Sequence, residues 1–83
     1  MTLYHFNARD ETQKADIIWS GVHLGYRLEG DHNILVYQID GFYVEVYYHR
    51  GFNAIQRFRS FSSVEQLAPY LENIDIYELI NKN

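Results

Sequence analysis

Several features that would assign a function class are missing from this chain of 83 residues. It has no cysteine, which excludes disulfides and thiolate metal sites and is typical of a reducing compartment. No apolar run approaches the roughly 18 residues of a membrane-spanning helix. The first residues, Met-Thr-Leu-Tyr-His-Phe, lack the basic and apolar regions of a signal peptide. We therefore expect a cytoplasmic protein without a membrane segment.

Positive charge and catalytic motifs are also scarce. Seven Lys and Arg residues stand against eleven Asp and Glu residues, and the formal net charge of −4 disfavours nucleic acid as the main partner. Neither a glycine-rich phosphate loop nor an HExxH helix is present. Ser62 and Ser63 are better placed to cap a helix than to act as nucleophiles. We predict a protein that is not an enzyme and needs no cofactor.

Apolar and aromatic residues are plentiful, at 47% and 17% of the chain, and they suffice for one small core. A chain of this length forms one domain, so residues 1–83 are treated as a single unit. The strongest local signal is Asp40-Gly41, which lies between two alternating apolar runs and predicts a tight hairpin turn. This turn pairs Ile39 with Phe42, so that paired residue numbers add up to 81. We expect a positive φ at Gly41.

A second hairpin is predicted just before the first. A turn at Gly30-Asp31 pairs Glu29 with His32 and, at the far end, Val22 with Ile39. Both registers place their apolar residues on one side of the sheet, which we name face A and predict to be the core. From the central hairpin, face A carries Leu35, Tyr37, Ile39, Phe42, Val44, Val46 and Tyr48. The opposite side, face B, carries Ile34, Val36, Gln38, Tyr43, Glu45 and Tyr47.

A fourth strand is predicted at residues 54–61. Its apolar residues do not keep one phase, which favours a bulge near one end. We place Phe58 on face A, and Arg57 and Arg59 on face B or at its edge. An N-terminal helix is predicted to begin at Asn7 and to end at Ser20-Gly21, with Gly21 in the left-handed conformation. Trp19 is predicted to fill the space between this helix and face A.

The C-terminal part predicts a second helical region. Ser62-Ser63-Val64-Glu65 fits a capping box, Pro69 restricts the helix that follows, and residues 75–80 form a further helical piece. The predicted fold is therefore α+β, in the order α-β-β-β-β-α. It is a four-stranded antiparallel meander sheet with the N- and C-terminal helices packed on one face.

Three segments carry a resemblance to known proteins: DGFYVEVYY from Asp40, Arg59-Ser60-Phe61, and LAPYL from Leu67. The chain resembles a group of short bacterial proteins of unknown function with the same helix–meander–helix pattern. The resemblance covers most of the chain from the first helix onward. It implies a fold and no particular activity, because none of these segments is a chemical motif.

Face B is predicted to remain open, because both helices are needed to cover face A. Tyrosine and arginine with few lysines are typical of interface cores, although β-propensity alone also favours Val, Ile and Tyr in strands. We interpret the chain as a protein-interaction module that binds itself as a homodimer, or binds another protein. The alternative is single-stranded nucleic acid or a small ligand stacked on the same face. The candidate residues are Arg27, Ile34, Val36, Tyr43, Glu45, Tyr47, Arg57 and Arg59.

Two histidines meet in the predicted register. His32 and His49 are cross-strand partners, and Glu29 lies opposite His32. Two imidazoles and one carboxylate at one end of a sheet form a weak candidate for a metal site. Surface histidines near turns are common without a metal, so we expect no metal there.

Overall fold

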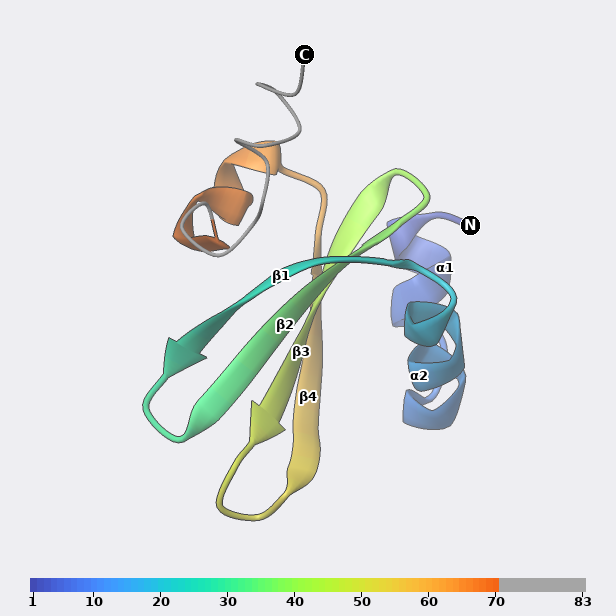
Figure 1. Ribbon diagram of the computed structural model, residues 1–83. Helices are drawn as coiled ribbons and strands as arrows, with labels where there is room; N and C mark the ends of the chain where they lie inside the picture. Colours follow the sequence, from blue (N-terminus) through green and yellow to red (C-terminus); the bar gives the residue numbers. More distant parts are fainter. Residues whose placement is uncertain (71–83) are drawn as a thin grey trace.

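The computed structural model describes residues 1–70 of the chain. Two short helices, α1 (Leu3–Asn7) and α2 (Glu11–Trp19), precede four strands: β1 (Val22–Glu29), β2 (His32–Ile39), β3 (Phe42–His49) and β4 (Ala54–Phe61). A 3-10 helix, η1 (Val64–Tyr70), follows. The strands form one antiparallel sheet in the order β1-β2-β3-β4 (Figure 1). The α+β meander is therefore confirmed, and the helical piece predicted at residues 75–80 lies outside the described residues.

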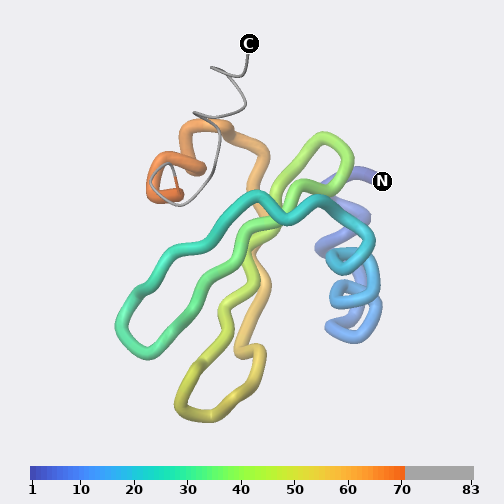
Figure 2. The backbone as a smooth tube through the Cα atoms, viewed as in Figure 1, coloured from blue at the N-terminus to red at the C-terminus, as the bar shows by residue number. Residues whose placement is uncertain are grey.

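The register of the central hairpin is confirmed along its whole length. β2 and β3 pair from Ile39 with Phe42 to His32 with His49. The register of the first hairpin is confirmed only near its turn. Leu24 is an extra residue in β1, so Val22 pairs with Gln38 and not with Ile39. A bulge bends the strand that carries it, and the backbone trace bends in the part of β1 that follows α2 (Figure 2).

Both hairpin turns have a positive φ at their first central residue only. The φ angle is 58° at Gly30 and 49° at Asp40, and Gly41 has no positive φ. The prediction for Gly41 is therefore wrong, because it assumed a type I′ turn with positive φ at both central positions. A positive φ at the first position alone is the pattern of a type II′ turn.

The N-terminal helical region is divided in two. Thr2 caps α1 by accepting a hydrogen bond from the His5 N–H, and Asp10 caps α2 in a reciprocal capping box with Gln13. Asn7 is the last residue of α1 and not an N-cap, so one continuous helix from Asn7 was a wrong prediction. The reason is the capping box. The first backbone N–H groups of a helix have no partner within the helix, and the side chains of Asp10 and Gln13 accept hydrogen bonds from such groups, so a new helix begins here.

Face A forms the core on the side of α1 and α2. Ile18 of α2 is fully buried there, whereas Trp19 is 54% exposed and meets the edge of Tyr37 at 5.6 Å between ring centroids. Trp19 is therefore not the predicted plug, because the short helix turns Ile18 toward the sheet instead. Phe58 packs against this core as predicted. The buried members of the core are Phe6, Ile18, Ile39, Phe42, Val44 and Val46.

Gly21 joins α2 to β1 at a close approach of two backbones. A Cβ atom there would lie 2.2 Å from Ile39 Cδ1 and 2.8 Å from the Gln38 carbonyl oxygen. Gly21 has no positive φ, so the predicted left-handed conformation is wrong. Glycine is needed at this position for space.

Face B forms a second core, and η1 covers it. The helices therefore do not all pack on one face. α1 and α2 lie on one side of the twisted sheet and η1 on the other (Figure 1). The chain leaves β4 on face B because Phe61 pairs with Tyr43, which belongs to that face. The buried members of the second core are Ile34, Val36, Tyr47, Phe61, Leu67 and Tyr70.

The predicted bulge in the fourth strand is confirmed. Tyr47 pairs with Arg57 and Tyr48 with Ile55, so Gln56 is the extra residue. Beyond the bulge, Arg57 and Arg59 pair with Tyr47 and Glu45 and lie on face B, as predicted. Among residues 1–70, no helix is long and apolar enough to cross a membrane.

Candidate functional site

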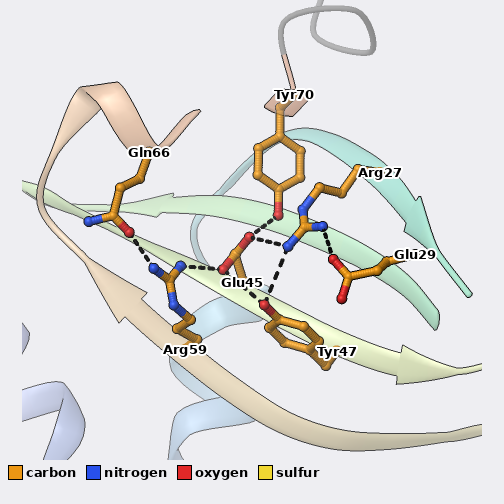
Figure 3. A network of polar contacts seen from close by, with 7 residues as sticks. All are labelled: Arg27, Glu29, Glu45, Tyr47, Arg59, Gln66 and Tyr70. Atoms are coloured by element: carbon orange, nitrogen blue, oxygen red, sulfur yellow. Dashed lines mark hydrogen bonds and ion pairs between the residues drawn. The ribbon is translucent and has the colours of Figure 1, made fainter. Parts of the chain in front are cut away.

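The candidate residues of face B gather around one buried carboxylate. The side chain of Glu45, in the middle of β3, is only 3% exposed. Arg59 Nη1 lies 2.5 Å from its Oε1, and Arg27 Nη2 lies 3.5 Å from its Oε2. The hydroxyls of Tyr70 and Tyr47 also donate to this carboxylate, the latter at 3.4 Å (Figure 3). Three strands and η1 therefore meet at one charged group.

Each arginine of this network has a second acidic or polar partner. Arg27 also binds Glu29, and Arg59 also binds the side-chain oxygen of Gln66 in η1 (Figure 3). Burial opposes the charge of Arg27, but its hydrogen bonds to Glu29 and Tyr70 and the nearby charge of Glu45 outweigh burial and raise the Arg27 pKa. The hydrogen bond from Arg27 lowers the pKa of Glu29. Both arginines are therefore held in place by at least two partners each.

The tyrosines of face B are packed rather than presented to solvent. Burial, followed by the hydrogen bond to Glu45, raises the pKa of Tyr70. The guanidinium of Arg57 lies 3.9 Å from the ring centroid of Tyr47, and Tyr43 lies against Phe61 at 5.4 Å between centroids. A nucleobase would have to displace these neighbours before it could stack on either ring. The geometry therefore gives no support to the alternative of single-stranded nucleic acid.

The predicted interface on face B is largely occupied by the chain itself. Ile34 and Val36 are fully buried, and Tyr47 is 7% exposed. Face B was predicted to lack any covering element, and this premise is wrong because η1 inserts Leu67 and Tyr70 there. Of the candidate residues, Arg57 and Arg59 remain exposed, and Arg27 and Tyr43 are half-buried.

A cavity of about 340 Å³ opens between η1 and the network. Its lining carries two arginines and two glutamates, so it has no net charge that would select an ion. None of the lining residues is a serine, cysteine or histidine, so the lining offers none of these as a nucleophile or base. The lining residues are Arg27, Glu45, Tyr47, Arg59, Glu65, Gln66 and Pro69.

The histidine pair forms as predicted, with ring centroids 5.0 Å apart. His32 Nε2 lies 2.6 Å from Gln56 Oε1, and His49 Nδ1 accepts the Phe52 N–H at 3.1 Å. A neutral His49 therefore carries its proton on Nε2 and has no lone pair left for a metal. Glu29 is bound to Arg27. No cluster of three or more potential ligands suited to a metal occurs within residues 1–70.

Sequence reasoning missed a second surface, on face A. The helix α2 has nine residues and the strands have eight, so α2 is about 14 Å long and a strand about 26 Å. The helix is thus about half as long as a strand and does not follow any strand over its whole length. The capping pair Asp10 and Gln13, which sets its start, is the signal that could have found the surface. We name the uncovered part of face A the open band. It consists of the sheet residues Tyr26, Leu28, Leu35, Tyr37, Tyr48, Ile55 and Phe58, and we include the adjoining Trp19 at the C-terminal end of α2.

Most members of the open band lie in two neighbouring rows across the sheet, which also contain the buried Val46 and the polar Asn33. One row runs from Tyr26 through Leu35 and Val46 to Phe58, and the next from Leu28 through Asn33 and Tyr48 to Ile55. The exposed fractions are 62% for Leu28, 54% for Trp19, 46% for Tyr26 and 37% for Ile55. The band contains no charged residue. It therefore has the character of a surface that another molecule covers.

Comparison of the chain with protein-family models, with curated proteins and with solved structures gave no match. The resemblance to short bacterial proteins therefore stays a prediction.

Proposed function

We propose that this protein is a small, non-enzymatic interaction module that forms a homodimer through the open band on face A. The observation that carries the proposal is the uncharged apolar band over all four strands, next to α2. As predicted from the sequence, the module binds a second copy of itself, but the contact surface that we now propose is on face A and not on face B.

The size of the band suits an interaction site. A fully accessible aromatic side chain contributes roughly 150–250 Å², so the exposed halves of Trp19 and Tyr26 together leave roughly 200 Å². With Leu28, Ile55 and the half-buried members, the band reaches the several hundred Å² that mark interaction sites. Burying such a band on both partners approaches the lower end of specific dimer interfaces.

The chemistry of the band favours a second copy as the occupant. The chain has a net charge of −4, so two copies repel one another through most of their surfaces, but the neutral band brings no like charges together. A twofold axis lets one apolar patch cover itself.

The test is the substitution Leu28→Glu, which places a charge at the β1 end of the band, on its most exposed member. We expect the wild-type chain to sediment as a dimer at micromolar concentrations. Leu28→Glu should weaken association at least about tenfold, that is by 1.4 kcal/mol, with little change in the thermal melt because Leu28 is 62% exposed. The matched control is Val64→Glu, an equally exposed residue of η1 (67%), which should leave the dimer intact.

A wild-type chain that remains a monomer at high micromolar concentration would refute the proposal. A Leu28→Glu dimer as strong as the wild type would place the contact elsewhere.

A further inference from the structure

Within residues 1–70, the helix η1 is held on the sheet through side-chain contacts. It is a 3-10 helix of seven residues with Pro69 inside, a type of helix that is weak by itself at this length. Its hydrogen bonds to the sheet, within the described residues, run from Tyr70 to Glu45 and between Gln66 and Arg59. Ser62-Ser63, which belong to no helix or strand, join it to β4. The helix is therefore an arm on a short connection.

The surface beneath the arm does not tolerate exposure to water. Ile34 and Val36 are fully buried under it, and each buried aliphatic side chain contributes about 1.5–3 kcal/mol to stability. Glu45 would also lose the hydrogen bond that the Tyr70 hydroxyl donates to it. If the arm leaves face B, other side chains must therefore take the place of Leu67 and Tyr70. The replacement needs an aliphatic side chain and a phenol three positions apart, as Leu67 and Tyr70 provide.

We propose that two copies of this chain exchange η1, so that the arm of each copy fills face B of the other. A second copy is the occupant because it carries Leu67 and Tyr70 at the required spacing. In the exchanged pair every contact of the arm is kept, and only Ser62-Ser63 changes conformation, which is how domain swapping forms dimers at low cost. The exchange uses face B and leaves the open band on face A free. It is therefore independent of the proposed function.

The absence of cysteine from the chain makes a clean cross-linking test possible. One variant carries Gln66→Cys on the arm and the other carries Arg59→Cys on β4, since these two side chains are in contact. Both variants also carry Leu28→Glu, which removes contact through the open band. The two chains are unfolded together, refolded at high concentration and treated with a short bis-maleimide. We expect a covalent heterodimer, detected by its mass.

Two controls make the result decisive. A single chain with both cysteines should cross-link internally when dilute, which shows that the reagent spans the two positions and that the fold forms without Arg59. Adding Tyr70→Ala to the Gln66→Cys chain should reduce the heterodimer, because the arm loses its anchor in face B. If the doubly substituted chain cross-links internally and the mixture gives no heterodimer, the exchange is refuted. Formation of a homodimer through the open band would be unaffected by that result.

Discussion

The two faces of the sheet are covered in different ways. On face A, two helices close a core of aliphatic and aromatic side chains that contains no charge. On face B, among residues 1–70, the 3-10 helix η1 closes a core that holds a buried carboxylate with two arginines and two tyrosines. The same two central strands therefore take part in one core that depends on shape and volume and in another that depends on charge pairing. The two sides should respond to different perturbations.

The largest effect is expected from Ile18→Ala on face A. Ile18 is fully buried, and truncation of such a residue costs about 2–5 kcal/mol of the free energy of unfolding. The neighbouring Trp19→Ala is the control. Although Trp19 is larger, it is half exposed, and losing its contact with Tyr37 should cost only about 1 kcal/mol. Urea unfolding measures both, and a reversed order would show that Trp19 is the true anchor of α2.

An intermediate effect is expected from Glu45→Gln on face B. This substitution keeps the shape and removes the charge that pairs with Arg27 and Arg59. We expect a loss of about 1–2 kcal/mol, low for a buried pair because the Arg59 side chain is 42% exposed. The control is Glu29→Gln, which removes an exposed partner of the same Arg27 and should change unfolding little. Equal effects of the two substitutions in urea unfolding would mean that burial gives Glu45 no special role.

The smallest effect concerns alkaline pH and distinguishes the two faces by titration. Because burial and Glu45 raise the Tyr70 pKa above its usual value of about 10, the folded chain holds a proton that the unfolded chain releases. This stability is complete below about pH 10 and is lost as the pH rises through the folded-state pKa of Tyr70. In thermal melts, Tyr70→Phe should therefore flatten the alkaline decline.

Tyr37→Phe on face A is the control for this titration. Burial alone raises the pKa of Tyr37, so this variant should keep most of the decline. If Tyr37→Phe flattens the curve more than Tyr70→Phe does, the alkaline sensitivity belongs to face A.

The strand pairing was predictable because local chemistry determines it. Alternation and turn residues led to the register of the central hairpin, the phase of Phe58 and the bulge near one end of β4. The bulge at Leu24 was not predictable, because that residue continues the alternation of β1 without interruption. Alternation in the sequence predicts which residues share a face. It does not reveal a bulge when the extra residue is itself apolar and falls in step with the alternation.

The covering of the two faces was not predictable from the same pattern. Both faces of β2 and β3 carry aliphatic residues, so the sequence alone does not decide which face a helix covers. The outcome depends on where the chain leaves β4, through Phe61, and on the helix start at Asp10, which shortens α2 and leaves the open band uncovered. The network around Glu45 was missed for the same reason. Its residues were placed on face B, but Tyr70 was not placed there with them.

The bulges in β1 and β4 have a consequence for crowded solutions. These two strands are the edges of the sheet, and a straight edge is the place where sheets of different molecules join end to end into ribbons and fibrils. Leu24 and Gln56 interrupt the regular spacing of hydrogen-bonding groups on both edges, and Arg57 and Arg59 add charge beside one of them. Both features disfavour growth of the sheet by edge-to-edge pairing with further copies.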